Sequence, residues 1–179
     1  RAAVSKVDET LGLRGEAVAA APSVATHALT APRIAYVHSW LRTQDEGWWR
    51  AALDSYGIPY DYFADTTLKQ TNLRAKYDVV IYPTVAVGAR EQFQGVPMNG
   101  TDAIPYKKSA LTPHLGMLDS ADDIRGGLGG AGLDALRNFV QAGGTLLADG
   151  STVEMLSAFG LTPGVTTTTP SELYNKGAI

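Results

Sequence analysis

Residues 78–83 read Asp-Val-Val-Ile-Tyr-Pro, and this short apolar stretch closed by a proline decides the fold class. Such a run is typical of a strand buried inside a sheet, and the proline ends it because proline has no N–H to donate. Residues 34–37 (Ile-Ala-Tyr-Val) and 145–148 (Thr-Leu-Leu-Ala) have the same apolar character, and residues 59–63 add a more aromatic stretch. The sequence therefore predicts four short strands.

Helical patterns alternate with these strands. Apolar side chains recur at i, i+3, i+4 and i+7 over residues 49–56, which follow acidic residues suited to a helix N-terminus. A similar pattern covers residues 133–140, and a shorter helix is expected over residues 152–159. Strands that alternate with helices predict an α/β domain whose parallel sheet is covered by helices on both faces.

The chain of 179 residues is long enough for a single domain with one sizeable core. Residues 1–30 are rich in Ala, Ser, Thr and Val, and we expect a linker or peripheral N-terminal arm there. The α/β domain is then expected to span residues 31–179. Residues 83–125 show little periodicity, and loops of this length usually have a function. The threonine tract at residues 166–169 fits either an edge strand or a loop.

Composition excludes several classes of chemistry. The chain has no cysteine, which rules out disulfides, thiolate metal sites and a cysteine nucleophile. Fifteen Lys and Arg residues oppose eighteen Asp and Glu residues, and no basic stripe is present, so we expect no nucleic-acid partner. There is no uninterrupted run of about 18 apolar residues, so we also expect no membrane span.

The three histidines lack the spacing of a zinc site. Zinc hydrolases commonly place a His and a second His or Glu three or four residues apart, so that both ligands share one helix face. None of His27, His38 and His114 has such a partner at that spacing. The sequence therefore predicts no metal site and no cofactor within this chain.

Residues 127–132 (Gly-Leu-Gly-Gly-Ala-Gly) fit the pattern of a dinucleotide-binding loop. That motif must follow directly on a strand, because its N–H groups cradle pyrophosphate where a strand turns into a helix. Here it follows a polar, turn-like run at residues 119–125. We expect a flexible loop at the entry of a helix.

Ser151 lies where a hydrolase nucleophile would lie, between a predicted strand and a predicted helix. A nucleophile elbow needs glycine two residues to either side, and Asp149 and Val153 occupy those positions. A catalytic triad of Ser151, His114 and Asp149 is therefore the alternative hypothesis. The preferred interpretation is that Ser151 is a helix N-cap, with Glu154 completing a capping box.

Polar and aromatic residues gather where parallel strands are expected to end, which is where such sheets bind ligands. His38 follows the first strand and is a second catalytic candidate, together with Asp149. The candidate ligand-binding residues are Trp40, Asp45, Glu46 and Trp48. The alternative interpretation is that the tryptophans pack against the sheet while the polar groups cap helices.

Several sequence segments taken together resemble those of a known family. They are residues 33–40 (RIAYVHSW), 45–48 (DEGW), 73–83 (LRAKYDVVIYP), 122–132 (DDIRGGLGGAG), 133–149 (LDALRNFVQAGGTLLAD) and 173–177 (LYNKG). Over residues 31–179 the chain resembles the region that follows the catalytic domain in bacterial zinc carboxypeptidase-like proteins of the metallocarboxypeptidase family. Its more widely shared part is similar to degenerate class I glutamine-amidotransferase-like domains, which have a flavodoxin-like fold.

The resemblance implies a non-catalytic accessory domain of a secreted protein, located in the periplasm or outside the cell. The zinc and the catalytic glutamate would belong to an upstream peptidase domain, which is the expected partner, with a peptide or cell-wall-like ligand as a further one. Glutamine hydrolysis in this fold uses a cysteine, and the chain has none. The alternative functions are an independent hydrolase using Ser151, a histidine and Asp149, and a small-ligand or sugar-binding module using Trp40 and Trp48.

Overall fold

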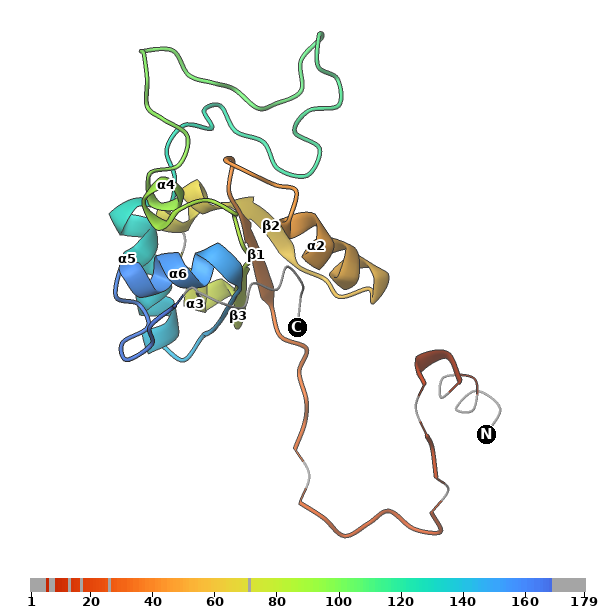
Figure 1. Cartoon of the computed structure of the whole chain (residues 1–179). Helices are drawn as coiled ribbons and strands as arrows, with labels where there is room; N and C mark the ends of the chain where they lie inside the picture. Colours follow the sequence, from red (N-terminus) through yellow and green to blue (C-terminus); the bar gives the residue numbers. More distant parts are fainter. Residues whose placement is uncertain are drawn as a thin grey trace. The chain divides into compact units, whose positions relative to one another are not determined.

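A computed structural model of the chain describes residues 6, 9–12, 14–16, 18–25, 27–70 and 72–168. The chain divides into two units, residues 1–31 and residues 32–179, and the second contains a four-stranded parallel sheet. The strands are β1 (Ile34–His38), β2 (Asp61–Ala64), β3 (Val79–Tyr82) and β4 (Thr145–Ala148), in the order β2-β1-β3-β4. Figure 1 labels the first three. This strand order is the one in which a flavodoxin-like sheet begins, so the predicted fold class is confirmed.

The parallel register sorts the strand side chains onto two faces of the sheet. Ala35 pairs with Val80, and Tyr36 pairs with Ile81. Because successive side chains of a strand point to opposite faces, Ala35 and Val80 share one face and Tyr36 and Ile81 share the other.

The first face carries the hydrophobic core. The helices and turns on this side are η1 (Asp65–Gln70), α3 (Leu73–Lys76), α4 (Ala89–Gln94), α5 (Gly129–Gln141) and α6 (Gly150–Ala158). From α5, Leu136 and Phe139 are buried in this core, and Met155 and Leu156 are buried from α6. The predicted stripe on α5 was wrong at its last position, because Val140 is 46% exposed while the neighbouring Phe139 is buried.

The second face is covered by α2 (Glu46–Ser55), which lies on the opposite side of β1 and β2 from α5 and α6 (Figure 1). The predicted helix is confirmed, but its predicted apolar face was wrong, because Tyr56 is 80% exposed. The inward side of α2 instead begins at Glu46, which is buried. This polar side fits because the strands below it present tyrosine hydroxyls: Tyr36 donates to the Glu46 carbonyl oxygen at 2.7 Å.

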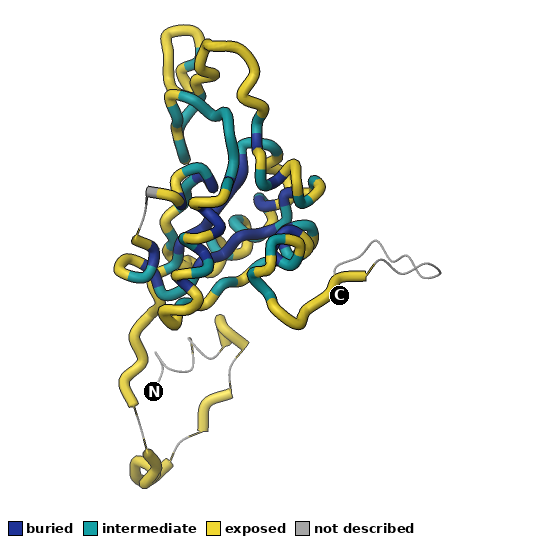
Figure 2. The backbone as a smooth tube through the Cα atoms, turned by 90° about the vertical axis from the view of Figure 1, so that its left-hand side faces the viewer, coloured by how far each residue is buried: buried dark blue, intermediate teal, exposed yellow. Residues whose placement is uncertain are grey.

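The stretch between α4 and α5 forms an excursion loop (residues 95–127) beyond the strand ends, and Figure 2 shows most of its outer part exposed. Its two arms are joined by backbone bridges between Val96 and Gly126 and between Tyr106 and Ala121. The arms meet so closely that a Cβ on Gly127 would lie 2.6 Å from the Gly95 nitrogen. Residues 83–125, which show little periodicity in the sequence, therefore contain one short helix, α4, and most of an excursion loop whose two arms are bridged by backbone hydrogen bonds.

The remaining predictions near the C-terminus have two outcomes. Residues 166–168 are in neither helix nor strand, so the described part of the threonine tract is a loop. Residue 169 and the phrase at residues 173–177 lie outside the described residues. Among the described residues, the helices are all too short or too polar to cross a membrane.

Candidate functional site

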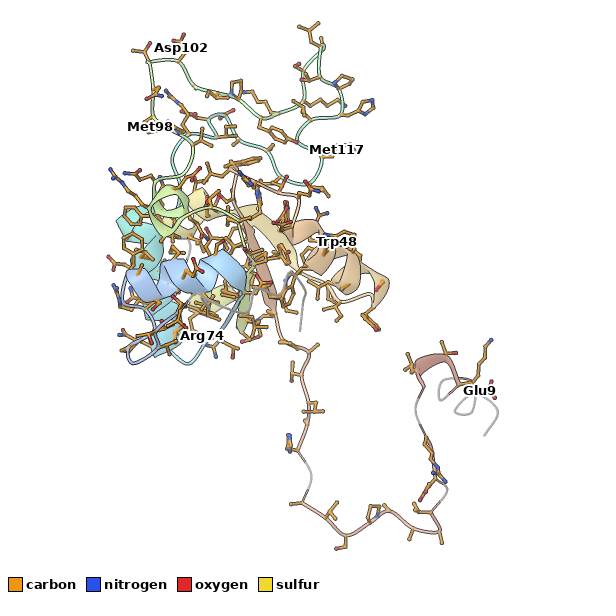
Figure 3. All side chains as sticks on the ribbon, viewed as in Figure 1. Glu9, Trp48, Arg74, Met98, Asp102 and Met117 are labelled. Carbon is orange, nitrogen blue, oxygen red and sulfur yellow. The ribbon has the colours of Figure 1, made fainter. Side chains whose placement is uncertain are left out.

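A cavity of about 480 Å³ opens at the carboxyl ends of β1 and β2, between α2 and the excursion loop. We call it the Glu46 cavity. Its lining side chains are mostly polar or aromatic and include His38, Trp40, Thr43, Glu46, Arg50, Tyr62, Tyr106, His114, Met117, Leu118 and Asp119. Four residues predicted from the sequence therefore meet here: His38, Trp40, Glu46 and His114. Figure 3 shows Met117 on the part of the excursion loop nearest to the ends of these strands.

Glu46 is the most deeply placed carboxyl of the cavity, with 3% of the residue exposed. Its Oε1 accepts a hydrogen bond from the Tyr62 hydroxyl at 2.6 Å, whereas its buried Oε2 has no partner. Burial raises the pKa of this carboxyl from 4.5 to about 7, although the Tyr62 hydrogen bond and the charge of Arg50 act in the opposite direction. Glu46 therefore exchanges its proton near neutral pH.

His38 forms a dyad with Asp119, which comes from the excursion loop. The His38 Nε2 lies 2.8 Å from an Asp119 oxygen that also accepts from the Ala64 backbone N–H at 2.9 Å. A carboxylate on Nε2 fixes the tautomer with the proton on that nitrogen. Burial lowers the pKa of His38, and the Asp119 hydrogen bond opposes this shift. The imidazole is therefore neutral at neutral pH, and Asp119 anchors the excursion loop to the sheet.

Aromatic rings build the walls of the cavity. The His38 ring stacks on Tyr62 with centroids 4.4 Å apart, and the Arg50 guanidinium lies 4.5 Å from the centre of the same Tyr62 ring. Trp40 packs edge-on against His38 and lies 5.0 Å from Tyr106 of the excursion loop. The buried Trp40 Nε1 has no hydrogen-bond partner. The wall thus combines apolar ring faces with an unpaired N–H donor.

A second group of polar residues, the Asp149 cluster, lies at the carboxyl ends of β3 and β4 and comprises Thr84, Val85, Ala86, Asp149 and Ser151. The Ser151 Oγ accepts from the backbone N–H groups of Val85 (3.3 Å) and Ala86 (3.0 Å) and lies 3.0 Å from the Thr84 Oγ1. One Asp149 oxygen accepts from the Thr84 N–H, and the other accepts from the Trp49 indole at 3.1 Å. The side-chain oxygens of Ser151 and Asp149 are thus engaged in holding the loop that follows β3, and Asp149 also holds Trp49 of α2.

The predicted N-cap role of Ser151 was wrong. Helix α6 begins at Gly150 with Asp149 as its N-cap residue, so Ser151 lies inside the first turn. Its side chain bonds across to the loop after β3, as Val85 and Ala86 show, and does not cap its own helix. The capping box with Glu154 is therefore not formed.

The hydrolase triad is not assembled among the described residues. His114 lines the Glu46 cavity, whereas the hydrogen-bond partners of Ser151 all lie in the loop after β3. His38, the other candidate base, is paired with Asp119 and not with Asp149. Neither histidine is hydrogen-bonded to Ser151.

Two of the predicted ligand-binding residues lie outside the Glu46 cavity. Trp48 is 76% exposed on the outer side of α2 (Figure 3). The interpretation that it packs against the sheet was therefore wrong. Asp45 lines a separate hollow of about 440 Å³ together with Arg42 and Thr84, where the loops after β1 and β3 diverge.

The glycine-rich motif at residues 127–132 has a structural explanation. It follows the bridge at Gly126 instead of a strand, and α5 begins within it at Gly129. Gly127 is required because the arm carrying Gly95 passes too close for a Cβ. In the described part of the chain, no group of three or more His, Asp or Glu side chains is placed to hold a metal ion.

Three important residues of the cavity were missed by sequence reasoning: Arg50, Tyr62 and Asp119. Arg50 carried a usable signal, since it stands four residues after Glu46 and the two share a helix face. Tyr62 was predicted to lie in a strand. Aligning that strand with the first one would have placed Tyr62 beside Tyr36 on the same face of the sheet. Asp119 had no local signal, because its partner His38 lies 81 residues away in the sequence.

Comparisons with known proteins identify no relative. No family model, curated protein or solved structure matches the chain. The function is therefore inferred from the geometry of the cavity and from the sequence resemblance over residues 31–179.

Proposed function

We propose that this domain binds a small polar organic ligand in the Glu46 cavity. The single observation that carries the proposal is the Glu46 carboxyl, which is 3% exposed, lines the cavity and has no partner for Oε2. Buried polar atoms in native proteins are nearly always hydrogen-bonded, so an unpaired one in a cavity wall needs an explanation. A ligand that completes this bond supplies one.

The shape and lining of the cavity support a binding site. Its volume of about 480 Å³ falls within the range of roughly 300–1,000 Å³ typical of small-molecule pockets. Trp40 and Tyr106 offer aromatic surface, and Arg50 and Glu46 offer groups that orient a ligand. A pocket that combines apolar walls with a few polar groups and a carboxyl of shifted pKa is the usual pattern of a ligand site.

Binding is favoured over hydrolysis because the cavity contains no activated nucleophile. The catalytic candidate Ser151 lies in the Asp149 cluster, where its oxygen accepts two backbone N–H bonds. In the cavity itself, the Nε2 of His38 is occupied by Asp119. The proposal therefore corresponds to the small-ligand module and not to the serine hydrolase.

The experiment is a chemical-shift titration of the ¹⁵N-labelled chain with a panel of monosaccharides, amino acids and small carboxylic acids. Binding should shift the indole signal of Trp40 and the backbone signals of Glu46, Arg50 and Asp119. Trp40→Ala should abolish the shifts, and Trp48→Ala, which removes an exposed indole from the same part of the chain, is the matched control. Shifts confined to other surfaces would contradict the proposal.

We propose the molecular setting from the sequence resemblance alone. The domain would serve as a non-catalytic accessory to an upstream zinc carboxypeptidase domain of a secreted bacterial protein, bringing a peptide or cell-wall-like ligand to it. The resemblance over residues 31–179 supports this setting. Reading the gene upstream tests it: a His-x-x-Glu zinc motif followed by a later His is expected, and its absence would remove the proposed parent.

A further inference from the structure

Glu46 and Arg50 are four residues apart on α2, and both line the Glu46 cavity. A Glu followed by a basic residue at this spacing lies on one helix face and commonly forms an ion pair. The ion pairs found among the described residues do not include one between these two side chains. The two groups thus face the same cavity without a direct ion pair between them.

Arg50 is held by the face and the Nε of its guanidinium and not by its two terminal nitrogens. Its guanidinium lies over the Tyr62 ring, and its Nε lies 3.4 Å from the Tyr60 hydroxyl, which itself donates to Asp54. In the described structure the two terminal nitrogens of Arg50 make no hydrogen bond to protein. Terminal guanidinium nitrogens form a fork that matches the two oxygens of a carboxylate.

Glu46 presents a donor beside this fork. The Tyr62 hydroxyl donates to Oε1, so the carboxyl proton, when present, is on Oε2, the oxygen without a partner. Burial keeps this proton in place up to a pKa of about 7. The titratable and charged groups around Glu46 are Tyr36 and His38 of β1, Tyr62 of β2, Arg50 of α2 itself, and His114 and Asp119 of the excursion loop.

The unpaired groups of the cavity are mainly donors. They are the Arg50 terminal nitrogens, the protonated Glu46 Oε2 and the Trp40 Nε1. The carboxylate of Asp119 already accepts from Ala64, Ser120 and His38, so it is engaged in anchoring the excursion loop. His38 Nδ1 is the one buried acceptor left unpaired in the lining. The missing ligand group is therefore an acceptor, and the free fork of Arg50, the one Arg or Lys side chain in the lining, matches the two oxygens of a carboxylate.

We propose that the Glu46 cavity binds small organic monocarboxylates, with the Arg50 fork on the carboxylate, the protonated Glu46 donating to it, and the Trp40 and Tyr106 rings packing against an apolar body. This inference rests on the proposed ligand-binding function and names its ligand class. Because Glu46 must carry a proton to donate, binding above neutral pH takes up a proton and becomes weaker as the pH rises.

The test compares phenylacetate with its uncharged isostere phenylacetamide by calorimetric titration of the full chain. At pH 6.5 phenylacetate should bind at least about tenfold more tightly, because only the acid pairs with Arg50. Its affinity should fall about twentyfold between pH 6.5 and pH 8.5 as Glu46 loses its proton. The affinity of a dipeptide, N-acetyl-glycyl-phenylalanine, is measured beside that of phenylacetate. This comparison shows whether the site prefers the C-terminal carboxylate of a peptide or that of a small free acid.

Two variants assign the effect to the residues named. Arg50→Gln should weaken phenylacetate binding at least about tenfold, while Arg137→Gln, which removes an arginine of α5 outside the cavity, should not change it. Glu46→Gln keeps an N–H donor at the same place and should flatten the pH dependence. A pH dependence that persists in Glu46→Gln overturns the role of the proton.

The results separate this inference from the proposed function. Equal binding of phenylacetate and phenylacetamide, with shifts at Glu46 and Arg50, overturns the carboxylate and leaves the ligand site standing. Tighter binding of phenyl phosphate than of phenylacetate also overturns the carboxylate. If neither these probes nor the whole panel shifts the signals of the cavity residues, both the carboxylate site and the proposed ligand-binding function are overturned. The comparison of acid with amide uses the wild-type chain, so it does not depend on whether any variant folds.

Discussion

The two halves of the carboxyl edge of the sheet both carry polar residues but differ in how many of these are hydrogen-bonded. At β3 and β4, the Asp149 cluster has hydrogen bonds on both oxygens of Asp149 and on Ser151 Oγ. At β1 and β2, the Glu46 cavity leaves buried Glu46 Oε2 and Trp40 Nε1 unpaired. Satisfied polar groups stabilise a fold, whereas unsatisfied ones remain available to a ligand.

This difference has a consequence for mutations. Changes in the Asp149 cluster should lower stability and leave ligand binding intact, because its bonds join β3 to α6 and α2. Changes in the Glu46 cavity should alter binding and the pH dependence of stability. The expected effects run from the removal of Asp149, the largest, to that of the exposed Trp48, the smallest.

Asp149→Ala should give the largest loss of stability, about 3 kcal/mol, because the Thr84 N–H and the Trp49 indole lose a charged acceptor together. Urea denaturation measures the free energy of unfolding. The free energy of unfolding of Asp149→Asn, which keeps one acceptor oxygen, should lie between those of Asp149→Ala and the wild type. A loss below about 1 kcal/mol in Asp149→Ala would show that this cluster does not hold the strand ends together.

Glu46→Gln should change how stability depends on pH by roughly 2 kcal/mol. The folded-state pKa of Glu46 is raised to about 7 from 4.5, so the unfolded chain ionises first and wild-type stability falls as the pH rises through this window. Glutamine does not titrate, so the variant should gain relative to wild type between pH 4.5 and pH 7.

Chemical denaturation of both proteins across this range provides the measurement for Glu46. Asp65, whose pKa burial raises to about 6, titrates in both proteins and cancels in the difference. A difference in stability that stays constant with pH would mean that folding does not raise the pKa of Glu46.

Ser151→Ala should cost about 1–2 kcal/mol, since two backbone N–H groups, those of Val85 and Ala86, lose their acceptor. Thermal unfolding detects this loss. Ser157→Ala is the matched control on the same helix, because its hydroxyl makes one exposed bond to the Val165 carbonyl. Unchanged affinity for cavity ligands is expected, and weaker binding in Ser151→Ala would extend the site to this cluster.

Trp48→Ala should have the smallest effect, within about 0.5 kcal/mol, because the indole is 76% exposed. Trp40→Ala removes a ring that contacts both His38 and Tyr106, so it should lower both the stability of the protein and its affinity for the ligand. Parallel urea denaturation of the two variants compares them directly. Similar losses in both would refute the contrast between the ring in the cavity wall and the exposed ring.

Much of the fold could be predicted because it depends on local pattern. The runs at residues 34–37, 78–83 and 145–148 each became a strand within one residue of the predicted limits. The buried faces of the helices were predicted less well. Helix α2 turns Glu46 inward and Tyr56 outward because tyrosine hydroxyls lie beneath it, and the periodicity of one helix does not contain the chemistry of its neighbour.

The sequence by itself determined the parallel α/β scaffold, the lack of cysteine chemistry and the gathering of polar residues at the strand ends. Only the tertiary structure decided which of these polar groups are satisfied. Asp119 reaches His38 across 81 residues, and Ser151 reaches Val85 across 66. Hydrogen bonds between distant segments leave no periodic trace in the chain, so burial and pairing, which separate a binding site from a structural cluster, follow only from the folded arrangement.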